Sequence, residues 1–188
     1  MDLPERILKA LARLQPRRLA AGNAPEAAVL MLMFEADGEP CFLLTRRTHE
    51  VRTHKGQISF PGGMKLAGES LQQTALRETY EEVGIDADLI RVLGRFHDYR
   101  AITGHLVAPF AGLIAGRFTV TPQRSEVAEV LTVPFAIFQD PGRLRTERRV
   151  LNGIAQEIYF YRYGSHEIWG LTAHIIKDFL EALQAAEP

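Results

Sequence analysis

The sequence contains a single cysteine, Cys41, among its 188 residues. An intramolecular disulfide is therefore excluded, and a structural zinc site, which commonly uses several thiolates, is disfavoured. Cys41 lies within an apolar stretch, which favours a buried thiol over a nucleophile. One cysteine agrees with a reducing compartment, so we expect a cytoplasmic protein whose stability comes from its core.

The sequence also lacks a strong charge of one sign and any long apolar run. It has 22 Lys and Arg against 23 Asp and Glu, a formal net charge of −1, which gives no overall attraction to nucleic acid or acidic membranes. No stretch reaches the length of a membrane span, and residues 1–14 lack the apolar core of a signal peptide. We expect neither nucleic acid nor membrane as a partner, and an anionic substrate must be met by local charge.

The length and the apolar pattern predict a single α/β domain over residues 1–188. Strands interleaved with a central helix, with helices at both ends, favour a mixed sheet between helices. The first helix is amphipathic and suits docking on the domain or on a second subunit, so a homodimer is compatible with it. The expected elements are strands at 27–34, 41–45, 90–96, 106–115 and 127–133, a hairpin within 150–163, helices at about 4–14, from Ser70, and at about 171–185, and one helical turn at 134–138.

Residues 60–85 hold the densest pattern of the chain. Ser70, with Gln73 three residues later, forms a capping box that starts a helix, and Gly84 provides its stop. Within this helix Glu78, Glu81 and Glu82 are expected to converge, away from its apolar side. Like charges one turn apart repel, so something should compensate them. A solvated acidic helix face is one interpretation, and a site for Mg²⁺ or Mn²⁺, which prefer oxygen ligands, is the other.

The full pattern separates these two interpretations. The pattern consists of Gly63, five residues, Glu69, seven residues and then residues 77–85, of sequence RETYEEVGI. It resembles the Nudix box. Thr79 departs from it, since a bulkier apolar residue is usual there. The resemblance implies a Nudix-type α/β/α sandwich and a Mg²⁺-dependent hydrolase of nucleoside diphosphates linked to another group.

A basic stretch precedes the glycines of this box. Arginine forks suit bidentate contacts with phosphate, although each residue here also fits a basic strand end and an exposed loop. This stretch reads LLT, one residue, Arg47, then Arg52, Gly56 and FPGG. The pattern resembles a signature of coenzyme A pyrophosphatases, which cleave coenzyme A to 3′,5′-ADP and 4′-phosphopantetheine. Thr48 departs from the usual Ser or Ala, and residues 168–173 (IWGLTA) resemble the tail of that subfamily. The predicted substrate contacts are Arg46, Arg47, Arg52, Lys55, Gly56 and Phe60.

The resemblance also implies roles within the box. Glu78 and Glu82, helped by Glu81, would hold the metal ion, with Glu69 acting directly or through water. A backbone carbonyl of Gly62 or Gly63 could join them, because glycine lets the main chain approach a ligand closely. Arg77 would orient the carboxylates. The general base stays open among Glu81, Glu126 and Glu129.

Other functions remain open. The first is a Nudix hydrolase of ADP-ribose, NADH or a nucleoside triphosphate. The second is a non-catalytic Nudix module that senses a nucleotide, whose expected mark is the loss of box carboxylates. All of those carboxylates are present in this sequence, which favours the enzyme.

Overall fold

A computed structural model describes residues 2–48, 56–151 and 154–186 of the chain. Eight of the described strands form one mixed sheet in the order β3-β2-β1-β7-β5, with β4 against β1, β6 against β7 and β8 against β2. Only the β1–β7 pair is parallel among the described pairs of this sheet. The strands are β1 Glu26–Ala36, β2 Glu39–Arg47, β3 Ile58–Ser59, β4 Gly62–Met64, β5 Ile90–Arg95, β6 Tyr99–Arg100, β7 Leu106–Ile114 and β8 Val127–Pro134.

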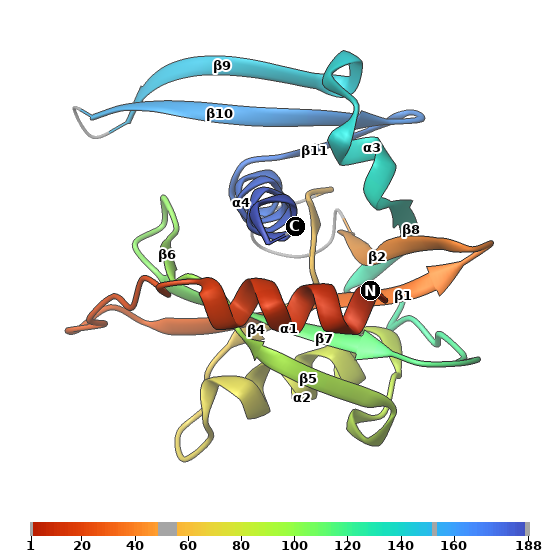
Figure 1. Ribbon diagram of the computed structural model, residues 1–188. Helices are drawn as coiled ribbons and strands as arrows, with labels where there is room; N and C mark the ends of the chain where they lie inside the picture. The colour runs from red at the N-terminus through yellow and green to blue at the C-terminus, as the bar shows by residue number, and fades with distance from the viewer. Residues whose placement is uncertain (1, 49–55, 152–153, 187–188) are drawn as a thin grey trace.

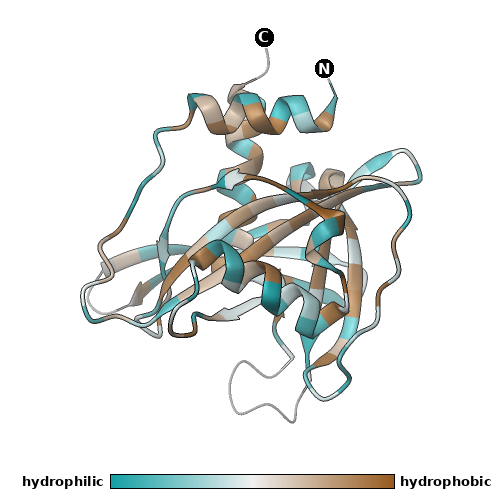
Figure 2. Cartoon of the chain, turned by 90° about the horizontal axis from the view of Figure 1, so that it is seen from below, coloured by the Kyte–Doolittle hydropathy of each residue, from teal (hydrophilic) through white to brown (hydrophobic). Residues whose placement is uncertain are grey.

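The central strand β1 is apolar because both faces of the sheet are covered. Leu30 and Leu32 enter one apolar cluster, whereas Met31 and Met33 enter another, as the alternation of side chains along a strand requires. Figure 2 shows hydrophobic colouring concentrated on the strands, while α2 and the loops carry hydrophilic residues. Continuous apolar runs were therefore a sound basis for predicting β1, β2 and β7.

Helices cover both faces of this sheet. Helix α2 (Leu71–Val83) packs beneath it, and α1 (Leu3–Arg13), α3 (Phe135–Gln139) and α4 (Leu171–Ala185) belong to the opposite side (Figure 1). Short 3₁₀ turns occupy Ala87–Leu89 and Pro141–Arg143. The predicted mixed sheet between helices is confirmed, as are the positions of the four helices to within a residue or two. No described helix is long and apolar enough to cross a membrane.

A second sheet was only partly expected. Strands β9 (Leu144–Leu151), β10 (Ile154–Tyr163) and β11 (His166–Trp169) form an antiparallel sheet that lies beyond α4 (Figure 1). The predicted hairpin within 150–163 began too late, because β9 is rich in Arg and Glu and has no apolar alternation to mark it. The strand is defined by its pairing with β10 along eight residues, not by its composition.

The apolar face of α1 is used within the chain. Ile7 and Ala10 are buried in the same cluster as Phe179 and Leu183 of α4. The first helix therefore docks on the domain itself, which is one of the two arrangements that its amphipathic pattern predicts. A homodimer stays a prediction, and it would use another surface.

Candidate active site

Helix α2 is placed by its own end signals. The Ser70 hydroxyl accepts from the Gln73 N–H, and the Gln73 side chain accepts from the Ser70 N–H, which is a complete capping box. At the other end Gly84 adopts φ 70°, where a side chain would be strained, and its N–H donates to Tyr80. The predicted helix start and stop are both found. The acidic residues of the box therefore have a rigid support.

Arg77 joins the acidic residues of α2 to the loop before it. Its guanidinium contacts Glu69 at 2.9 and 3.1 Å, and it donates to Glu78 Oε1 and Glu81 Oε2, each at 2.9 Å. A further bond reaches the Met64 carbonyl at 3.0 Å. One cation thus compensates three carboxylates, as the repulsion between them requires.

Glu69 is fully engaged in this arrangement. Besides Arg77 it accepts from the Leu66 N–H at 2.7 Å and from the Thr74 hydroxyl at 2.8 Å. The hydrogen bonds from Arg77, with the bond from Leu66, lower the pKa of Glu69 to about 2. Its oxygens point at the loop and at Arg77, and it lines a small surface hollow with Lys65 and Gly68. This placement suits an orienting carboxylate better than a direct ligand.

Glu82 is the most deeply buried of the three carboxylates of α2. It is only 4% exposed, and it accepts from Thr45 Oγ1 at 3.4 Å and from Arg47 Nη1 at 3.5 Å. Burial raises its pKa to about 8, against the opposing effect of Arg47. All three carboxylates line one cleft, as expected, but they differ in depth: the Glu81 side chain is 55% exposed, whereas Glu82 is buried.

Glu78 lies against the glycine strand β4. A Cβ placed on Gly63 would be 2.4 Å from the Glu78 carboxyl carbon, so no larger residue fits there without displacing that carboxylate. Burial raises the pKa of Glu78, against the lowering effect of Arg77. Gly62 meets a similar restriction from β1, since its Cβ would lie 2.3 Å from the Ala28 carbonyl oxygen. The main chain therefore passes directly beside the Glu78 carboxylate.

The two neighbouring arginines of β2 point in opposite directions. Arg47 lines the cleft above α2, with its guanidinium 3.5 Å from Glu82 and 3.9 Å from Glu126. Its buried Nε has no hydrogen-bond partner in the described part of the chain. Arg46 is paired with Glu129 at 3.0 Å, and Glu129 also meets His166 at 3.3 Å. Successive side chains of a strand face opposite sides, so Arg46 does not reach the described cleft wall.

The other predicted substrate contacts divide in the same way. Gly56 lines the cleft. Phe60 also borders it but is 2% exposed, with its ring 5.4 Å from that of Phe42, so packing is its main contribution. Arg52 and Lys55 lie outside the described residues.

Backbone bonds position the loop that carries Glu126. Thr121 and Gln123 donate to the carbonyls of Val83 and Glu82 at the end of α2, at 2.8 and 2.9 Å. From the other side the Thr48 N–H donates to the Glu126 carbonyl at 2.9 Å, and the Thr48 hydroxyl bonds Ser125. Thr48 keeps the hydroxyl that Ser would supply at this position, and uses it to hold this loop. Thr79, the other departure, is buried, with its hydroxyl donating to the Ala75 carbonyl at 2.7 Å.

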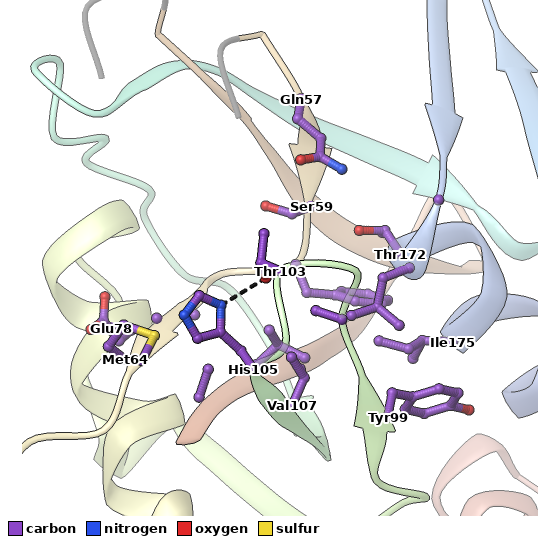
Figure 3. Close-up of a pocket in the computed structure, with 18 of the residues that line it drawn as sticks. Gln57, Ser59, Met64, Glu78, Tyr99, Thr103, His105, Val107, Thr172 and Ile175 are labelled. Atoms are coloured by element: carbon purple, nitrogen blue, oxygen red, sulfur yellow. Dashed lines mark hydrogen bonds between the residues drawn. The ribbon is translucent and has the colours of Figure 1, made fainter. Parts of the chain in front are cut away.

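A cleft of about 1900 Å³ runs from these acidic residues to α4. Figure 3 shows Glu78 and Met64 on one side, Thr172 and Ile175 on the other, and His105 between them, bonded to Thr103 at 2.8 Å. Tyr99 and Trp169 also line it. The sequence pattern did not single out Tyr99, Thr103 or Trp169 as cleft residues, because they come from strand ends that only the fold brings together.

The described residues contain no ready-made group of three His, Cys, Asp or Glu side chains that could hold a metal ion. Arginines occupy these carboxylates instead: Arg77 engages Glu69, Glu78 and Glu81, while Arg47 engages Glu82. The chemistry of the donors nevertheless fits a hard divalent cation. Glu78 is half-buried and Glu82 is buried, and burial is the main cause of the raised pKa of each carboxylate; the charge of Glu81 also raises the pKa of Glu78, and the charge of Glu78 also raises that of Glu82.

A family model of the NUDIX domain matches residues 24–151, more than half of the chain. The chain belongs to the NUDIX family. A Nudix hydrolase named NudL from Photorhabdus laumondii is 36% identical to it over 173 residues, which cover 90% of either chain. NudL of Yersinia enterocolitica is 37% identical over 164 residues, covering 87% of this chain and 83% of the relative.

Solved structures agree on the fold. The Nudix hydrolase RenU of M. smegmatis has a TM-score of 0.53 and 24% identity, and the match covers 62% of this chain and 77% of the RenU chain. A C. elegans Ap4A hydrolase complex has a TM-score of 0.52 and 22% identity, and the match covers 60% of this chain and 82% of the hydrolase chain. At this identity the likeness concerns the Nudix fold alone. Family membership makes this protein a Nudix hydrolase of a nucleoside diphosphate derivative.

Proposed function

We propose that this Nudix hydrolase cleaves the diphosphate of coenzyme A, or of its derivatives, to 3′,5′-ADP and 4′-phosphopantetheine. The observation that carries the proposal is the position of Arg47. This residue belongs to the coenzyme A signature, yet its guanidinium lies beside Glu82 of the Nudix box. Arg47 and Glu82, 35 residues apart in the sequence, therefore meet in one cleft, and the Nε of Arg47, which has no hydrogen-bond partner among the described residues, is a donor for a phosphate oxygen.

The cofactor would be Mg²⁺ or Mn²⁺. Glu78 and Glu82 would hold it, with Glu81 and the carbonyl of Gly63 as additional oxygen donors, and Gly62 shaping the turn. When bound, such a cation neutralises charge on the diphosphate and lowers the pKa of a coordinated water. Arg77 acts as the orienting group, because its bonds to Glu69, Glu78 and Glu81 fix where those carboxylates point.

Glu126 is the strongest candidate for the general base. It lines the cleft, its carboxylate is 3.9 Å from Arg47, and its backbone is held by Thr48. A carboxylate there can take the proton of the attacking water. Glu81 also lines the cleft but is committed to Arg77, whereas Glu129 is paired with Arg46 and His166 away from the described cleft wall.

The size of the cleft supports a long substrate. Ligand pockets commonly measure about 300–1,000 Å³, and this cleft exceeds them at about 1900 Å³. Coenzyme A carries a nucleotide on one side of its diphosphate and a pantetheine arm on the other. A cleft that extends past the acidic residues toward α4 can accept both.

A substrate panel tests the proposal. The protein is incubated with Mg²⁺ and with coenzyme A, ADP-ribose, NADH or a nucleoside triphosphate, and products are identified by mass spectrometry. We expect 3′,5′-ADP and 4′-phosphopantetheine from coenzyme A at the highest kcat/KM. Rapid cleavage of ADP-ribose with coenzyme A left intact would overturn the substrate assignment.

We also infer that residues 1–188 form one domain. A single apolar cluster contains Ile7 of the first helix, Phe42 of the main sheet, Tyr161 of the second sheet and Ala186 after the last helix. Elements from the whole chain thus share one core, which supports this inference.

A further inference from the structure

Trp169 is an exposed aromatic residue at the wall of the cleft. It is the only tryptophan of the chain, it is 39% exposed, and it ends β11 beside Gly170, whose neighbourhood includes the Gln57 side chain. The core does not require it. The preceding residue, Ile168, is fully buried, and successive side chains of a strand point to opposite faces.

The indole is supported on one side by a stack of two further groups. Its ring lies nearly parallel to that of Phe160, at 13° and 5.9 Å. The Arg145 guanidinium lies 3.9 Å from the Phe160 ring centroid, and it is held by Glu147 and by Glu167. Arg145, Phe160 and Trp169 are direct cross-strand neighbours on β9, β10 and β11. The register of the second sheet thus fixes the orientation of the indole.

We propose that Trp169 is the platform on which the nucleobase of the substrate stacks. A flat aromatic ring is the chemistry that an indole at a cleft wall recognises, because every base presents a π face. Gln57 and the backbone of Gly56 also line the cleft and offer polar groups to the edge of a base. The inference rests on the proposed function only in that the ligand is a nucleotide, whichever group lies beyond its diphosphate.

The single tryptophan makes a direct test feasible. Emission of the wild-type protein is followed during titration with AMP and with adenosine 3′,5′-bisphosphate, and ribose 5-phosphate serves as the matched ligand without a base. We expect saturable quenching by both adenine nucleotides and none by ribose 5-phosphate. Unchanged emission up to millimolar nucleotide, or equal quenching by ribose 5-phosphate, overturns the proposal.

Kinetics separate this inference from the proposed function. Trp169→Ala should raise KM for the nucleotide hydrolysed in the panel by roughly 5- to 150-fold, with little change in kcat, and Trp169→Phe should restore most of the loss. Leu89→Ala is the control, since Leu89 is an exposed apolar residue away from the described cleft lining. A normal KM for Trp169→Ala sinks the base platform alone. If adenine nucleotides quench the emission but coenzyme A is not hydrolysed, only the substrate assignment is overturned.

Discussion

Glu82 is an ionisable group in a buried position, and this combination gives its replacement two opposite effects. The pKa of about 8, raised from 4.5, means that the folded state holds the Glu82 proton more tightly than the unfolded state does. The free energy of unfolding of the metal-free protein should therefore fall as pH rises from about 4.5 to about 8. Glutamine is a neutral isostere of Glu82, so the variant should not lose stability in this pH range.

Glu82→Gln should accordingly be more stable than the wild type at pH 8 in EDTA, and the difference should shrink toward pH 5. Its kcat should drop by roughly two orders of magnitude or more, because a ligand of the metal is lost. Urea unfolding at both pH values and steady-state kinetics with Mg²⁺ measure the two effects. Glu181→Gln, a change at an exposed carboxylate of α4, is the control. Near-normal kcat in Glu82→Gln would rule out its role as a ligand.

Glu126 and Glu129 form a matched pair for identifying the base. They lie three residues apart, yet Glu126 lines the cleft and Glu129 is engaged by Arg46 and His166. We expect Glu126→Gln to lower kcat by roughly 10²- to 10⁴-fold and Glu129→Gln to leave it nearly unchanged, because Glu129 is engaged by Arg46 and His166. Initial rates at saturating substrate decide between them, and the reverse order would move the base to Glu129.

At the scale of the element, α2 is the support of the site, and its ends should control stability more than chemistry. Ser70→Ala removes one half of the capping box and should lower the free energy of unfolding by about 1 kcal/mol. kcat at 25 °C should change little, because Glu78, Glu81 and Glu82 lie toward the far end of the helix. Chemical denaturation measures the loss. Gln72→Ala, at an exposed position of the same turn, should have little effect, and an equal loss there would argue against the cap.

The elements also show where prediction from the sequence succeeds. Long apolar strands and capped helices were predictable, because burial and end signals leave local patterns. Strands β3, β4 and β6 are too short to carry a pattern, and β9 is too charged. Within the site, the acidic residues of the box could be named in advance. The opposite directions of Arg46 and Arg47, the burial of Glu82 and the fourfold engagement of Arg77 depend on strand register and helix rotation, which the sequence does not display.

At the scale of the whole molecule, metal binding should be coupled to both pH and stability. Raised pKa values at Glu78 and Glu82 mean that protons compete with the cation for the same oxygens. A cation that binds only the folded protein stabilises it in proportion to its affinity. The increase in Tm caused by Mg²⁺ should therefore be larger at pH 8 than at pH 6.

Differential scanning calorimetry with and without Mg²⁺ at the two pH values measures this coupling. Glu82→Gln should show a smaller increase in Tm at pH 8 than the wild type. An increase that is the same at both pH values would contradict the assignment of these carboxylates.

The loop between β7 and β8 ties the end of helix α2 to the start of β8. Its bonds from Thr121 and Gln123 to Val83 and Glu82, and from Thr48 to Glu126, use only main-chain groups. The spacing between the proposed metal ligand Glu82 and the proposed base Glu126 is therefore set by peptide geometry. The side chains of Thr121 and Gln123 line the cleft but make none of these bonds, so replacing them can alter the selection of substrates while the spacing between Glu82 and Glu126 stays constant.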